Sequence, residues 1–214
     1  MKKSTYYFIF AFFLIWGCSS QTQDTKLYNE GKEAYQVYTQ TLDEDSLYQT
    51  YQCFRQIKGK RYQKKISKML LGFYASYGDY DEGREYRKSL DGIVTKDKHL
   101  NYLLIVFPDF YDLMEAADND DKERVNNIAW TIIKNTRENQ SLLGQDNAKF
   151  EILAFISLLA PDSIFFTDLD NAFDSGNDII FYDVLDKYNG FEFDTISLLE
   201  FYSPYRTYRM TLHP

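Results

Sequence analysis

The stretch KISKMLLGFYASYGDYDEGREYRKSL, residues 65–90, contains two helical patterns separated by a turn. In its first half the large apolar side chains recur every three or four residues, as they do on one face of an α-helix. These side chains are Ile66, Met69, Leu70, Phe73 and Tyr77. Gly78 and Asp79 indicate the end of that helix, because glycine readily adopts the backbone conformation that closes one. Residues 81–90 indicate a second helix, so the stretch predicts a helical hairpin.

Helical spacing continues upstream of this hairpin. Apolar and small residues recur at intervals of three and four over 27–42 and again over 47–57. Between them stands Asp43-Glu44-Asp45-Ser46, whose side-chain oxygens are of the kind that cap a helix start. We therefore expect an earlier hairpin at 27–57.

The second half of the chain predicts helices without a repeat. Residues 99–107 are almost all apolar and indicate a buried helix, although a strand over 102–107 fits the same residues. We expect Pro108 to open a separate helix that ends near residue 117, because proline is tolerated best in the first turn of a helix. Further helical patterns lie at 125–133, 150–159, 179–188 and 194–202, and we expect the segment 150–159 to be buried.

Composition agrees with a packed helical protein. Of the 214 residues 44% are apolar, which is enough to form a core. The chain has only 10 glycines and 4 prolines, too few for the many turns of a β sandwich. We expect an all-α fold in which short helical hairpins form an α-solenoid or an irregular bundle.

The second hairpin resembles a tetratricopeptide repeat. Leu70 and Tyr74 match the Leu and Tyr of the family's first helix, and residues 78–82 look like its interhelix turn. Gly83 occupies the small-residue position that lets the second helix approach the first. The resemblance covers the hairpins within 25–95. It implies that the first helices line a concave groove that binds other proteins.

The first twenty residues resemble the leader of a bacterial lipoprotein. Two lysines precede an apolar run at 6–16, which is too short to cross a bilayer as a stable helix and is typical of a signal peptide. Ile15-Trp16-Gly17-Cys18 resembles the lipobox, in which an aliphatic, a variable and a small residue precede the lipidated cysteine. The resemblance implies that residues 1–17 are removed and that the Cys18 thiol is acylated. An uncleaved signal anchor and a soluble secreted protein are the alternatives.

The lipobox also predicts how the mature chain is organised. Ser19 follows the cysteine, which in such lipoproteins looks like an outer-membrane address. Residues 18–24 are short and polar and are expected to form the lipidated cysteine and a flexible tether. The tetratricopeptide-like hairpins of 25–95 come next, then an acidic helical region at 96–202 that is continuous with them. Residues 203–214 are expected to fray.

Cys53 would then be without a cysteine partner in the mature chain. It follows the helical spacing of Tyr51, Phe54 and Ile57, so we expect a buried, inert thiol. A catalytic cysteine would need a base nearby, and the chain contains only two histidines.

Charge is distributed unevenly along the chain. The formal net charge of −8 becomes −10 when Lys2 and Lys3 leave with the leader. Eleven acids and one cation lie in 150–200, which argues against nucleic acid as a partner. Seven cations and no acid lie in 46–78. They are Arg55, Lys58, Lys60, Arg61, Lys64, Lys65 and Lys68.

The basic segment has three interpretations. It forms a solvated helix face attracted to the chain's own acidic half, or it docks on anionic lipid or lipopolysaccharide phosphates. In the third, Lys65 and Lys68 match groove-lining positions of the repeat and together hold a partner's carboxylate, because residues three apart share a helix face. Arg61 and Lys64 belong to the same candidate partner-binding set. The many tyrosines of the hairpins predict interhelix packing, with sugar stacking as the alternative.

Common motifs for catalysis and cofactor binding are missing from the sequence. It contains no Gly-rich phosphate loop and no paired Cys or His at metal-ligand spacing. A Ser-His-Asp site would have to use His99, and the acidic cluster at 168–178 does not follow the calcium-binding pattern. We therefore expect no catalytic residue, no cofactor and no metal.

Together these features predict a non-catalytic, lipid-anchored protein of the bacterial envelope whose helical domain binds another protein. An inhibitor or immunity protein, with its acidic half covering a basic toxin site, is the alternative. A glycan-binding accessory lipoprotein and an enzyme with a diffuse site are the remaining interpretations.

Overall fold

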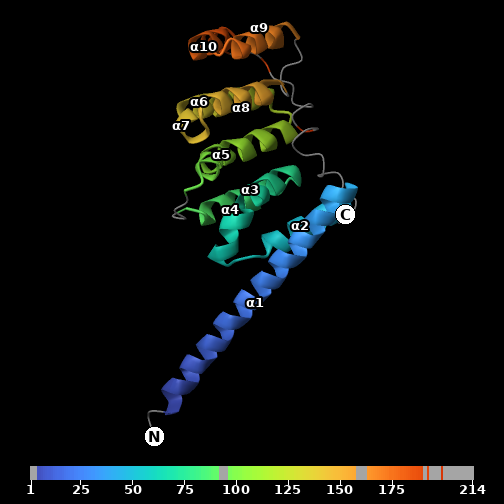
Figure 1. Cartoon of the computed structure of the whole chain (residues 1–214), viewed down its shortest axis with the longest axis vertical. Helices are drawn as coiled ribbons and strands as arrows, with labels where there is room; N and C mark the ends of the chain where they lie inside the picture. Colours follow the sequence, from blue (N-terminus) through green and yellow to red (C-terminus); the bar gives the residue numbers. More distant parts are fainter. Residues whose placement is uncertain (1–3, 92–95, 158–162, 190–191, 193–198, 200–214) are drawn as a thin grey trace. The chain divides into compact units, whose positions relative to one another are not determined.

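The computed structural model describes residues 4–91, 96–157, 163–189, 192 and 199, with side chains from residue 22 onward and, in the ninth helix, from residue 167. Within these residues every regular element is an α-helix, which confirms the all-α prediction (Figure 1). The helices are α1 (Ser4–Thr41), α2 (Glu44–Arg55), α3 (Lys60–Ser76), α4 (Tyr80–Ser89), α5 (Lys98–Asp118), α6 (Lys122–Glu138), α7 (Gln140–Leu143), α8 (Gln145–Ser157), α9 (Ser163–Asp174) and α10 (Asp178–Lys187). The strand alternative at 102–107 is wrong, because those residues lie inside α5. The helix predicted at 194–202 and the tail at 203–214 lie outside the described residues.

The chain forms two compact units, residues 1–70 and 71–214, and the boundary between them falls inside α3. In the first unit α1 packs along α2. A Cβ atom added at Gly31 of α1 would lie 2.5 Å from a ring carbon of Phe54, so the absence of a side chain lets the two helices approach closely. The Asp43 carboxylate accepts a hydrogen bond from the Ser46 N–H at 3.0 Å, which confirms the predicted cap of α2.

The predicted polar tether, residues 18–24, lies within α1. Its last residue, Asp24, accepts hydrogen bonds from the backbone N–H groups of Lys58 and Gly59, at 3.3 and 2.7 Å. These N–H groups stand just before α3, where the first turn of a helix leaves donors unpaired and attracts a carboxylate. Asp24 therefore joins α1 to the turn between α2 and α3.

In the second unit, α4 packs on α5, and α5 packs on α6. Gly83 of α4 is buried at this contact, where a Cβ would lie 2.6 Å from the Tyr111 ring and 2.9 Å from the Tyr74 Cβ. The Tyr111 hydroxyl donates to the Leu71 carbonyl at 2.9 Å. The small residue predicted from the repeat pattern is thus the residue that close packing requires.

Helix α5 continues through Pro108, so the prediction that Pro108 opens a separate helix is wrong. Proline has no N–H to give to the carbonyl four residues earlier, which here belongs to Leu104. The Arg87 Nε donates to that carbonyl instead, at 2.9 Å. A side chain of α4 therefore supplies the hydrogen bond that the proline removes. His99, predicted to begin a buried segment, is exposed in the first turn.

Lys149 ties α8 to the last described hairpin, α9–α10. Its side chain is almost fully buried, and its ammonium lies 2.7 Å from an oxygen of Asp178 and 3.2 Å from one of Asp146. Hydrogen bonding to Asp178 raises the pKa of Lys149, so the lysine keeps its charge despite burial. Phe150, expected to be buried with the residues after it, is instead 61% exposed.

Candidate binding pocket

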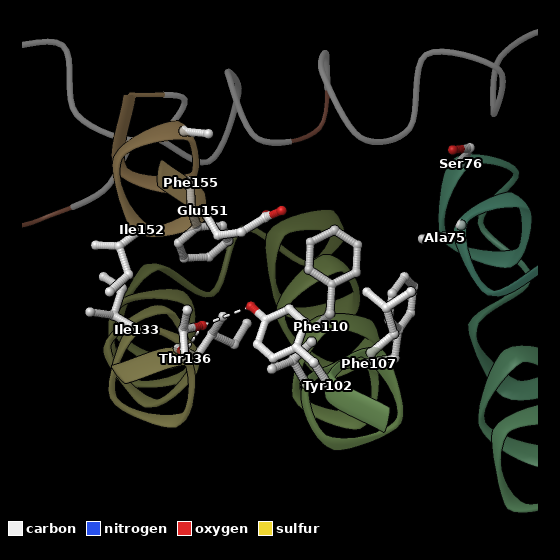
Figure 2. A pocket seen from close by; sticks show the side chains of 15 residues that line it. Ala75, Ser76, Tyr102, Phe107, Phe110, Ile133, Thr136, Glu151, Ile152 and Phe155 are labelled. Carbon is white, nitrogen blue, oxygen red and sulfur yellow. Dashed lines mark hydrogen bonds between the residues drawn. The ribbon is translucent and has the colours of Figure 1, made fainter. Parts of the chain in front are cut away.

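An apolar pocket of about 260 Å³ lies in the second unit, between the last turns of α3 and the helices α5, α6 and α8 (Figure 2). Helix α3 lines it with Gly72, Ala75 and Ser76; α5 with Tyr102, Leu103, Val106, Phe107 and Phe110; α6 with Ile132, Ile133 and Thr136; and α8 with Glu151, Ile152, Ala154 and Phe155. The rings of Phe107 and Phe110 meet edge to face, with centroids 5.5 Å apart, and both side chains are partly exposed. The pocket therefore presents aromatic surface to solvent.

The polar groups at the buried end of the pocket are paired with one another. The Tyr102 hydroxyl and the Thr136 Oγ1 are 2.8 Å apart, and the Thr136 hydroxyl donates to the Ile132 carbonyl at 2.8 Å. Since the single proton of Thr136 goes to Ile132, the Tyr102 hydroxyl is the donor in the first bond. Burial raises the pKa of Tyr102 to about 12, with a smaller contribution in the same direction from the charge of Glu151. An occupant of this end needs no polar group.

Of the described residues that line the pocket, Glu151 alone is charged. It is exposed on α8, and Figure 2 shows its carboxylate directed over the space beside Phe110. Among the described residues it has no hydrogen-bond or ion-pair partner. Its negative charge contributes to the raised pKa of Tyr102. The pocket thus combines an apolar interior with one negative charge at its edge.

Gly72 lines the pocket with its backbone alone, because it has no side chain. A Cβ added there would meet no atom within 4 Å, in contrast to Gly83 and Gly31. The backbone of α3 is therefore exposed to whatever enters the pocket, and this position has room for a larger residue.

The predicted cations lie on another part of α3. Arg61, Lys64, Lys65 and Lys68 are all exposed, and none of them lines the pocket. The Lys65 ammonium lies 5.3 Å from the centre of the Tyr28 ring and 5.8 Å from that of Tyr62, in cation–π contacts within the first unit. Arg61 lies 5.5 Å from the Tyr62 ring centre.

The tyrosines of the hairpins are mainly core residues, as predicted. Those buried are Tyr51, Tyr62, Tyr74, Tyr77, Tyr80 and Tyr86. Cys53 is also buried, and burial raises the pKa of its thiol. Cys18 lies within α1. In the part of the chain that the structure describes, no helix is both long enough and apolar enough to cross a membrane.

The acidic cluster does not come together as a metal site. Asp168, Asp170 and Asp174 are exposed on α9, and Asp178 pairs with Lys149. Over the described ranges, no group of three His, Cys, Asp or Glu side chains is arranged to hold a metal ion.

A second hollow, of about 690 Å³, is more polar and lies between α6 and α10. Arg137 lies in it, 3.0 Å from an oxygen of Asp186 and 4.3 Å from the centre of the Tyr182 ring. Because the main charges of this hollow are paired within the chain, the apolar pocket is the better candidate site.

The pocket was not foreseen from the sequence. Phe107 and Phe110 are residues of the type expected in a core. Their side chains are partly exposed because of the way the four helices around the pocket pack together. No family model, curated protein or solved structure matches the chain.

Proposed function

We propose that the protein is a lipid-anchored protein of the bacterial envelope, held through Cys18, whose helical domain binds another protein in the pocket between α3, α5, α6 and α8. The observation that carries the binding role is the partly exposed aromatic surface of Phe107 and Phe110 inside a preformed apolar hollow. Aromatic pockets of this kind receive the anchor side chains of protein partners.

The size of the pocket favours a side chain over a whole small molecule. At about 260 Å³ it lies below the range of roughly 300–1,000 Å³ that is usual for small-molecule sites. One or two large apolar side chains fill such a volume.

The position of the pocket agrees with the tetratricopeptide resemblance. Helices α3 and α5 are the first helices of consecutive hairpins, α3–α4 and α5–α6, and both line it. In that family the first helices form the binding groove. The lipid anchor would confine this groove to the membrane surface and raise the effective concentration for a membrane-bound partner.

A second candidate is an inhibitor of a basic protein. It is favoured by the exposed carboxylates of α9 and α10, which include Asp168, Asp170, Asp174 and Asp183. Binding through these residues would weaken strongly as salt rises, because exposed charges are screened. Binding through the apolar pocket would be much less sensitive to salt.

The anchor is tested by the Cys18→Ala variant. We expect the wild type to incorporate labelled palmitate and to sediment with membranes, and Cys18→Ala to lose both properties. Cys53→Ala is the control and should retain both. A Cys18→Ala protein that stays in the membrane, together with a wild type that takes up no palmitate, would show that the anchor is wrong.

The pocket is tested by photo-crosslinking in intact cells. p-Benzoylphenylalanine introduced in place of Phe110 should capture a discrete partner, whereas the same group in place of Ile180, which is exposed on α10, should not. Gly72→Phe should abolish the crosslink by filling the pocket from α3. Equal crosslinks from both positions, or a crosslink that survives Gly72→Phe, would exclude the pocket as the binding site.

A further inference from the structure

We infer that the pocket selects a basic segment of its partner: a large apolar side chain enters it while a neighbouring Lys or Arg pairs with Glu151. This inference rests on the proposed function, since it specifies the partner of the same site.

The interior determines what part of the partner enters. The hydroxyl groups of Tyr102 and Thr136 are already hydrogen-bonded within the chain, and the remaining lining at that end is aliphatic or aromatic. A polar group placed there would give up its hydrogen bonds to water without replacement. The inserted group is therefore apolar.

Glu151, at the edge of the pocket, determines which residue accompanies the inserted apolar side chain. A segment that fills the pocket lies beside the Glu151 carboxylate, which has no partner among the described residues. A neutral or acidic segment would leave this charge unpaired and partly desolvated, which is unfavourable. A Lys or Arg would pair with the carboxylate and lie close to the ring of Phe110 (Figure 2). Among the described residues, no Lys or Arg lines the pocket to compete for this carboxylate.

Gly72 determines how closely the segment approaches. Because no side chain projects from α3 at this position, the backbone of a peptide can lie against the helix. The occupant is thus a polypeptide with adjacent apolar and basic residues, and the anion of a fatty acid is disfavoured by the same carboxylate.

The test compares three peptides that differ only in charge. They are N-acetylated and C-amidated forms of AAFKAAFKAA, AAFQAAFQAA and AAFEAAFEAA, each with a rhodamine label, and binding is followed by fluorescence anisotropy. The full lipidated chain is held in phosphatidylcholine nanodiscs, whose zwitterionic lipid does not attract basic peptides. We expect the Lys peptide to bind at least tenfold more tightly than the Glu peptide, with the Gln peptide between them.

Variants of the pocket make the test specific. Glu151→Gln should remove the difference between the Lys and Gln peptides, and Glu151→Lys should reverse the order of the Lys and Glu peptides. Glu33→Gln, which removes one exposed carboxylate from α1, is the matched control and should leave the order unchanged. Gly72→Phe should abolish binding of all three peptides.

The outcomes separate this inference from the proposed function. Equal affinities for the three peptides, no detectable binding of the Lys peptide, or a Lys preference that survives Glu151→Gln would overturn the inference. Decanoate that displaces the Lys peptide and binds more tightly would overturn it in favour of a lipid. In each case the crosslink from position 110 decides the proposed function independently. If Gly72→Phe affects neither the peptides nor that crosslink, both fail.

Discussion

At the scale of single residues, the helical glycines Gly83 and Gly72 show opposite reasons for lacking a side chain. A methyl group at Gly83 would lie too close to the Tyr111 ring and the Tyr74 Cβ, whereas a methyl group at Gly72 would meet no atom within 4 Å. The sequence alone identified Gly83 through its place in the repeat pattern. It contained no sign of the role of Gly72, because an empty neighbourhood depends on several helices together.

We expect the two alanine variants to change stability in opposite directions. Gly83→Ala should lower the free energy of unfolding by about 1–3 kcal/mol, because an extra carbon in a filled site forces α4 away from α5. Gly72→Ala should raise it by about 0.5–1 kcal/mol, since alanine favours the helix and meets no neighbour. Urea unfolding followed by circular dichroism measures both. A stabilising Gly83→Ala would contradict the close contact.

At the scale of helices, the continuity of α5 depends on a residue in α4. Arg87 of α4 donates a hydrogen bond to the Leu104 carbonyl, to which Pro108 cannot donate because it has no N–H. The sequence pattern predicted a helix boundary at Pro108 because a proline leaves the carbonyl four residues earlier without its usual N–H donor. The partner that supplies the hydrogen bond lies in another helix, so local rules could not find it.

This arrangement predicts a coupling between Arg87 and Pro108. Arg87→Met should destabilise the protein by about 1–3 kcal/mol, because it leaves a carbonyl without a donor. In the Pro108→Ala background the restored N–H can serve that carbonyl, so the same substitution should cost less. A double-mutant cycle of urea unfolding measures the difference. Asp91→Asn, which removes only the ion pair of Arg87 with Asp91, is the control and should show no such coupling.

Helix α8 shows a second limit of sequence reasoning. The pattern predicted that burial begins at Phe150, yet Lys149 is buried and Phe150 is exposed. Burial of Lys149 depends on Asp178, which lies 29 residues later and at the start of α10. The presence and length of most helices could be predicted from spacing, because spacing is local. The orientation of this helix and the pocket it lines could not, because distant side chains determine them.

At the scale of the whole molecule, the core contains many tyrosines whose hydroxyls must stay protonated. Burial raises the pKa of Tyr102 to about 12 and raises the pKa values of Tyr86 and Tyr111 further. In the unfolded chain these groups lose their protons near pH 10. Above that pH the unfolded state binds fewer protons than the folded state, so the free energy of unfolding falls as pH rises.

We therefore expect cooperative alkaline unfolding between about pH 10 and 12. Each buried tyrosine contributes a slope of up to about 1.4 kcal/mol per pH unit. Absorbance at 295 nm and far-ultraviolet circular dichroism, recorded on the same samples, should change together. Tyr102→Phe should make the pH dependence less steep. Ionisation of all tyrosines near pH 10 with the helices intact would contradict the burial of these side chains.

The close contact between α1 and α2 also makes the reactivity of one native thiol a measure of how often these helices separate. The sequence contains two cysteines, and Cys53 lies buried beside Gly31 at that contact. If Cys18 is acylated, as we propose, Cys53 is the one thiol of the sequence that can react with a colorimetric disulfide reagent. The reagent reaches it only when α2 separates from α1, so the rate of colour release measures how often this hairpin opens. Such a measurement needs no engineered label.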